Sequence, residues 1–233
     1  MLETFAALLL AHVLADYVLQ TRWIVVSKRG PGFAVHIGLV FVTALLCLGQ
    51  VSLPVLVVTA AHLAIDATKT LLMPSRLWSY LADQALHLMS IATVAALFPE
   101  AWALGVWADM APAWIPAAIA GLAGLIFATR AGQFAIDYLV GGKAGEASSG
   151  QGAQTGLVER ALVFISVTVG QPWWAGALLA AKAAWIGLSG ARRPAALGRI
   201  ATGTLASFGW AFATGLATAA IVTRLAAASL GGP

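Results

Sequence analysis

Residues 53–73 read LPVLVVTAAHLAIDATKTLLM. This stretch is mostly apolar, and it has the length that a helix needs to cross the roughly 30 Å hydrocarbon core of a membrane. It also carries His62 and Asp66 four residues apart, so both side chains lie on one face of the predicted helix. The combination predicts a membrane helix with one polar face that points into a bundle.

The remainder of the chain has the same apolar character. Of its 233 residues, 61% are hydrophobic and only 9% are charged, and the mean hydropathy is +0.89, far outside the balance of a soluble globular protein. Turn and charge signals separate further apolar stretches at 3–21, 33–50, 78–98, 112–140, 157–170, 172–190 and 200–226. The sequence therefore predicts an all-α protein, a polytopic bundle of about eight transmembrane helices, with seven as the alternative.

The chain divides into two predicted halves of a single integrated membrane domain. Residues 1–98 hold the first four spans, and residues 99–233 hold the other four. The second half includes a Gly/Ser-rich loop at 141–156 that we expect to be flexible.

The distribution of Lys and Arg indicates the orientation of the helices. If the N-terminus is outside, nearly all of these residues lie toward the inner side, with Arg224 as the exception, and eight spans return the C-terminus to the outer side. The net charge of +4 is therefore assigned to orientation, and no basic stripe with interleaved aromatic residues predicts nucleic-acid binding. The single Cys47 excludes a disulfide framework within one chain.

The histidines of the chain fall in the first four predicted spans, one in each. Three of them have an aspartate four residues away, which gives a set of seven polar residues: His12, Asp16, His36, His62, Asp66, Asp83 and His87. The first and third spans read His then Asp, whereas the fourth runs in the opposite direction and reads Asp then His. We therefore expect the histidines near mid-membrane and the aspartates one turn closer to the inner face, with His36 at the aspartate level.

The spacing Ala11-His12-x3-Asp16 recurs as Ala61-His62-x3-Asp66, which predicts a duplicated helical hairpin.

These seven residues are predicted to form an intramembrane metal site for zinc or iron, with one or two ions. An aspartate at the centre of a membrane helix costs on the order of 3 kcal/mol and requires compensation. Imidazoles and carboxylates that converge from four helices are ligands that divalent metals accept. A dinuclear site would use them most fully, and a single zinc on three histidines, with aspartates as orienting groups or as a base, also fits. The alternatives are a polar network that fixes helix packing, and haem, which a carboxylate one turn from the ligand disfavours.

Three charged residues in the second half support a site that faces the inner side. Glu159 is predicted to be catalytic, and Arg160 and Lys182 are predicted to bind an anionic head group or phosphate of the substrate. The alternative is that Glu159 pairs with one of these cations and that Lys182 extends toward the interface.

An ordered set of motifs connects the chain with a known family. It comprises His12-x3-Asp16-Tyr17-x-Leu19-Gln20-Thr21, His36, His62-x3-Asp66, Asp83-Gln84-x2-His87, Glu159-Arg160, Gly170-Gln171-Pro172, Ala180-Ala181-Lys182 and Gly203-Thr204. This set resembles the bacterial domain-of-unknown-function 3307 membrane proteins over nearly the whole chain. The resemblance implies an integral protein of the bacterial inner membrane, without an established activity. Residues 187–194 read GLSGARRP, where a longer charged stretch is expected in relatives.

Three hypotheses for function follow. The first is a metal-dependent hydrolase that opens to the inner leaflet and acts on a lipid or lipid-linked substrate, with redox chemistry at a di-iron centre as a variant. The second is a transporter for a metal ion, a proton or a small anion, although the first, third and fourth spans lack Pro or Gly breaks between the predicted ligands. The third is a non-catalytic membrane partner with a structural polar network. Membrane lipid is an expected partner, and the sequence names no protein partner.

Overall fold

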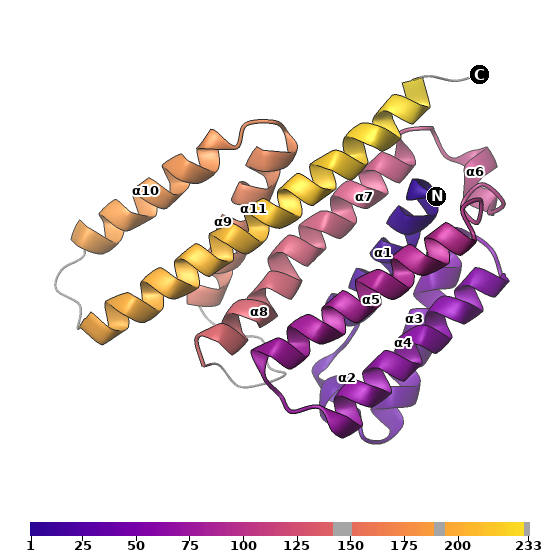
Figure 1. The fold of residues 1–233 in the computed structure, drawn as a ribbon, viewed down its shortest axis with the longest axis horizontal. Coiled ribbons are helices and arrows are strands. Elements are labelled where there is room, and N and C mark those ends of the chain that lie inside the picture. Colours follow the sequence, from indigo (N-terminus) through magenta and orange to yellow (C-terminus); the bar gives the residue numbers. More distant parts are fainter. Residues whose placement is uncertain (142–150, 189–193, 231–233) are drawn as a thin grey trace. The chain divides into compact units, whose positions relative to one another are not determined.

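The computed structural model describes residues 1–141, 151–188 and 194–230, and every regular element in these ranges is helical (Figure 1). The predicted all-α class is therefore confirmed. Contacts divide the chain into two compact units, which are described separately below.

The helices begin and end close to the predicted stretches. In chain order they are α1 (Leu2–Tyr17), α2 (Arg22–Val26), α3 (Pro31–Leu48), α4 (Leu53–Leu72), α5 (Leu77–Leu97), α6 (Val106–Met110), α7 (Ile115–Ile126), the π-helical turn η1 (Phe127–Ala131), α8 (Gly132–Leu139), α9 (Gln151–Thr168), α10 (Trp173–Leu188) and α11 (Pro194–Leu230). Because α9 begins at Gln151, the end of the predicted loop 141–156 is helical instead. Residues 142–150 of that loop lie outside the described residues, as do residues 189–193, where a difference from relatives was expected.

Five helices in the described part of the chain are long and apolar enough to cross a membrane. They are α3, α4, α5, the continuous helix Ile115–Leu139 formed by α7, η1 and α8, and the segment Leu197–Ser229 of α11. By length and composition, these helices indicate an integral membrane protein. The predicted total of about eight spans is not supported, because α1 and α10 have only 16 residues each, and because α9 begins with the polar stretch QGAQTG and carries the charged pair Glu159 and Arg160 in its middle. Both termini can lie on one side of the membrane only if the number of crossings is even. The predicted orientation therefore depends on whether α1, α9 and α10 cross the membrane.

Unit 1 comprises Met1–Ala123 and Ile221–Pro233, and its centre is a four-helix bundle. α1 packs against α3 and α5, and α4 closes the ring by packing against the same two helices (Figure 1, indigo to magenta). α1 is buried on all sides because Ala6 also packs with Ala120 of α7 and Leu225 of α11. The many alanines of α1 allow its neighbours to approach closely.

The ends of the bundle helices follow from individual residues. Pro31 and Pro54 stand in the first turns of α3 and α4, where the missing N–H of proline has no partner to lose. Gly49 ends α3 in the left-handed conformation, with φ of 67°, which favours glycine. Gln50 then donates a hydrogen bond from its side chain to the carbonyl of Ala101, which ties this end of the bundle to the link before α6.

Unit 1 buries polar side chains beside an apolar core that includes Leu8, Leu48 and Ile91. Its histidines and aspartates are among its most buried residues, whereas large apolar side chains on the outer faces of α4 and α5 are exposed, among them Leu56, Leu63, Leu86 and Met89. A soluble bundle would carry polar side chains on such outer faces. These outer faces therefore suit contact with lipid.

Unit 2 comprises Gly124–Ala220 and includes α8, α9, α10 and most of α11. Its apolar core contains Val163, Ala175, Phe208 and Ala211. A π turn widens the helix and leaves backbone carbonyls available to other donors, and the indole of Trp210 donates to the carbonyl of Phe127 in η1 at 3.2 Å. The sequence did not predict this turn.

Candidate metal centre

The four helices of the unit 1 bundle bring all seven predicted residues into one buried group, which we call the His/Asp cluster. α1 carries His12 and Asp16, α3 carries His36, α4 carries His62 and Asp66, and α5 carries Asp83 and His87. The side chain of Asp16 is 11% exposed, and those of the other six are at most 4% exposed. The predicted convergence of histidines and aspartates is confirmed.

Asp16, His36 and His62 form a compact triangle of ligand atoms. Nε2 of His36 lies 3.2 Å from Nε2 of His62, and Oδ1 of Asp16 lies 3.5 Å from the first nitrogen and 3.4 Å from the second. Oδ2 of Asp66 lies 3.1 Å from Nε2 of His36 and 3.9 Å from Nε2 of His62. The ligand atoms of a tetrahedral zinc ion with bonds of 2.0–2.1 Å are about 3.3–3.4 Å apart. The triangle therefore already has the dimensions of a metal site.

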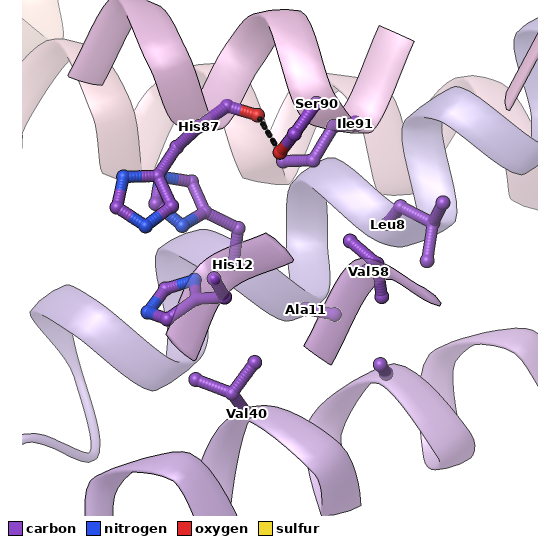
Figure 2. Close-up of a pocket in the computed structure, with 10 residues that line it drawn as sticks. Leu8, Ala11, His12, Val40, Val58, His87, Ser90 and Ile91 are labelled. Carbon is purple, nitrogen blue, oxygen red and sulfur yellow. Dashed lines mark hydrogen bonds between the residues drawn. The ribbon is translucent and has the colours of Figure 1, made fainter. Parts of the chain in front are cut away.

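A small cavity lies beside this triangle. Figure 2 shows the imidazoles of His12 and His87 on one side of it and Leu8, Val58 and Ile91 on the other. The cavity has room for about one water molecule or ion. Within the described residues, neither nitrogen of His12 has a hydrogen-bond partner, and Nε2 of His87 has none. Because buried polar atoms normally have partners, these nitrogens are available to a ligand.

Contacts with neighbouring groups influence where the histidines carry their protons. Nδ1 of His87 lies 2.9 Å from the carbonyl oxygen of Asp83, so this nitrogen donates and Nε2 keeps its lone pair. The side-chain amide of Gln20 lies 3.1 Å from Nδ1 of His36. Because the amide nitrogen faces Nδ1, the amide donates, Nδ1 accepts, and Nε2 of His36 carries the hydrogen, which faces Oδ2 of Asp66 at 3.1 Å. Metal binding through Nε2 requires a half turn of the amide, so that its oxygen accepts from Nδ1–H instead.

Two lysines that were expected only to mark orientation belong to the site. Nζ of Lys28 lies 2.7 Å from Oδ2 of Asp66, and Nζ of Lys69 lies 2.7 Å from Oδ2 of Asp83. Both carboxylates are almost fully buried, whereas the lysine side chains are 20% and 30% exposed. With neutral imidazoles, the three carboxylates and two lysines have a net charge of −1, which favours a cation. The ion pairs also compete with a metal for Asp66 and Asp83.

The other predicted site residues lie in unit 2 and form a group of their own. Nζ of Lys182 lies 2.5 Å from Oε2 of Glu159, so the ion pair considered as the alternative is present. Arg160 donates from Nε to the carbonyl of Thr129 and from Nη1 to the hydroxyl of Ser207. The catalytic role of Glu159 and the substrate-binding roles of Arg160 and Lys182 stay predictions.

Comparison with known proteins finds one matching family model, and that family has no described activity. The family model described as "Protein of unknown function (DUF3307)" matches residues 4–110. The matched region contains the whole His/Asp cluster with Lys28 and Lys69, and it ends before Glu159. No curated protein and no solved structure matches the chain. Residues 4–110 are therefore similar to the DUF3307 family, and the match does not extend to the rest of the chain.

Proposed function

We propose that Asp16, His36 and His62 bind a divalent metal ion, zinc or iron, and that the bound ion supports hydrolysis of a lipid or lipid-linked substrate. The observation that carries the proposal is the spacing of 3.2–3.5 Å between the three ligand atoms, which fits the edges of a tetrahedral shell. Two histidines and one carboxylate leave the fourth position open, as in catalytic zinc sites. Asp66, held by Lys28, lies next to that shell.

The cavity gives a reacting water a place beside the proposed ion. A bound metal lowers the pKa of its water and polarises the acyl or phosphoryl oxygen under attack. Nε2 of His87 carries a lone pair, belongs to a residue that lines the cavity, and has no hydrogen-bond partner among the described residues; its carboxylate neighbour, Oδ1 of Asp66, lies 3.9 Å away. This nitrogen is therefore placed to accept the proton of that water. His12 lines the same cavity and can hold the water in position.

The surroundings of the cluster favour a substrate that comes from the membrane. The outer faces of α4 and α5 are apolar, so lipid can reach the bundle directly. Asp16 is the most exposed member of the cluster, and the partly exposed Lys28 and Lys69 can attract an anionic head group. We include in this proposal the predicted location in a bacterial inner membrane, with both termini outside and the cluster open to the inner leaflet.

Elemental analysis of the detergent-purified wild-type protein tests the metal directly. We expect close to one equivalent of zinc or iron per chain, and a second equivalent if His12, His62 and His87, whose ligand atoms lie within 4.8 Å of one another, also hold an ion. A chelator should remove the metal, and addition of zinc should restore it. A protein that contains no metal and takes up none from a zinc solution would rule out the site.

A His87→Gln variant separates catalysis from metal binding. Because His87 lies outside the proposed ligand triangle, the variant should keep the ion bound by Asp16, His36 and His62, whereas loss of the proton acceptor should lower turnover at least about 100-fold. A second equivalent of metal, if the wild type holds one, should be lost. Turnover is measured as fatty-acid release from phosphatidylglycerol and as nitrophenol release from p-nitrophenyl palmitate. Thr93→Val, an exposed change on the same helix, serves as the control and should keep full turnover. If His87→Gln turned over substrate at the wild-type rate, His87 would not be the proton acceptor.

The lysine pairs favour a second candidate, a non-catalytic protein whose polar network fixes helix packing. Lys28 and Lys69 already bond to Asp66 and Asp83 at 2.7 Å, as such a network requires. The two functions differ in their response to chelation. A metal site loses thermal stability when its ion is removed, whereas a metal-free network melts at the same temperature with and without the chelator.

A further inference from the structure

Unit 2 contains a polar pocket that is separate from the proposed metal site. Its volume is about 380 Å³, and it is lined by residues of α8, α9, α10 and α11. The charged residues among them are Asp137, Glu159, Arg160, Lys182 and Arg199. The volume is within the range of pockets that bind small molecules or head groups.

Arg160 is the central cation of this pocket. Its side chain is buried, with a residue exposure of 3%, which is costly for a charge that lacks full compensation. Nε donates to the carbonyl of Thr129 at 3.0 Å, and Nη1 donates to Oγ of Ser207 at 3.1 Å. Nη2 has no hydrogen-bond partner within the described residues. The guanidinium is therefore held in place by two bonds while its third nitrogen can still donate.

The other charges leave the pocket positive. Glu159 is engaged by Lys182 at 2.5 Å. With Asp137 counted as negative and Arg160 and Arg199 as positive, the pocket has a net charge of +1. Ser207 accepts from Arg160, so its own hydroxyl hydrogen is free to donate, and the hydroxyl of Thr204 lines the same pocket.

We propose that this pocket binds a phosphate group, carried either by a membrane lipid or by free phosphate. A buried guanidinium whose Nη2 has no hydrogen-bond partner among the described residues offers the planar donor geometry that suits phosphate oxygens. Hydroxyl donors and a second arginine at the rim complete a site for a tetrahedral anion. The proposal rests on unit 2 alone and does not depend on the metal in unit 1.

Thermal unfolding of the full-length, delipidated protein in detergent tests the proposal with three probes. Dioleoylphosphatidic acid and dioleoylglycerol differ only in the phosphate, and sodium phosphate is compared with sodium chloride at equal ionic strength. We expect phosphatidic acid to raise the Tm by about 5 °C near saturation and dioleoylglycerol to leave it unchanged. A rise with sodium phosphate as large as with phosphatidic acid identifies free phosphate as sufficient, and a rise with phosphatidic acid alone identifies a lipid head group.

Substitutions locate the effect in the pocket. Arg160→Gln should lose most of the Tm rise, and Arg199→Gln, an exposed change that does not threaten folding, should lose part of it. Arg224→Gln removes an exposed arginine of the same helix outside the pocket and should keep the full rise. Equal shifts with phosphatidic acid and dioleoylglycerol, or no shift with any probe, would overturn the proposal. The proposal would also be overturned if Arg199→Gln kept the full Tm rise while Arg160→Gln either kept the full rise as well or did not fold.

Discussion

Replacing His36 with alanine is expected to weaken zinc binding roughly 1,000-fold. Structural zinc sites contribute about 10–16 kcal/mol, so loss of one of three protein ligands removes roughly 4 kcal/mol, and each 1.4 kcal/mol corresponds to about tenfold in affinity. His36 is fully buried, and its Nε2 lies within 3.5 Å of the possible metal-ligand atoms of Asp16, His62 and Asp66. No other histidine of the cluster can take its position, because each is fixed to a different helix. Competition with a chromophoric zinc chelator in detergent measures the affinity.

The matched control is Thr43→Val on the same helix. Thr43 is also buried, but its hydroxyl bonds only to the carbonyls of Leu39 and Val40 within α3. This variant should bind zinc like wild type and report any general effect of disturbing α3. Equal zinc affinity in the two variants would show that His36 is not a ligand.

A Lys69→Met change in metal-free protein is expected to lower the free energy of unfolding by about 3 kcal/mol. Asp83 is 1% exposed, and Lys69 is its cationic partner at 2.7 Å. Without the lysine, the buried carboxylate keeps the neutral amide of Gln84, at 2.9 Å, but loses its cationic partner. Removing one partner of a buried ion pair costs about 3–5 kcal/mol, and the partial exposure of Lys69 puts the effect at the lower end. Denaturant unfolding in detergent, followed by circular dichroism, measures the loss.

A double variant shows whether the loss comes from the ion pair. Lys69→Met combined with Asp83→Leu removes the unpaired charge, so most of the stability should return. Arg76→Met, an exposed cation at the start of α5, should unfold like wild type. If Lys69→Met is as stable as wild type, the carboxylate of Asp83 does not depend on the lysine for its burial.

The sequence predicted the parts of the structure that depend on local patterns. Apolar runs and Pro or Gly breaks placed the helices to within a few residues, as at Pro31 and Gly49. The four-residue spacing from His62 to Asp66 placed both side chains on one face, and the reversed order of Asp83 and His87 indicated that the faces meet. These features need only helix geometry.

The features that the sequence did not reveal depend on contacts between distant segments. Lys28 and Asp66 are in contact although they are 38 residues apart in the sequence, and Gln20 and His36 are 16 residues apart. Neither contact is therefore visible as a local sequence pattern. The predicted count of about eight spans is not supported in part because α1, although apolar enough to resemble a membrane span, has only 16 residues. Its apolar surface is covered by protein on all sides.

The enclosure of α1 also determines when unit 1 can finish folding during synthesis. α1 leaves the ribosome before α3, α4 and α5, which can join it as soon as they are made. The contacts of Ala6 with Leu225, and of their neighbours Leu2 and Ile221, must wait for the end of α11. α1 is therefore not fully covered until the end of α11 has been translated, and ribosome-bound chains that stop at residue 220 should leave this end of α1 open to lipid or to a chaperone.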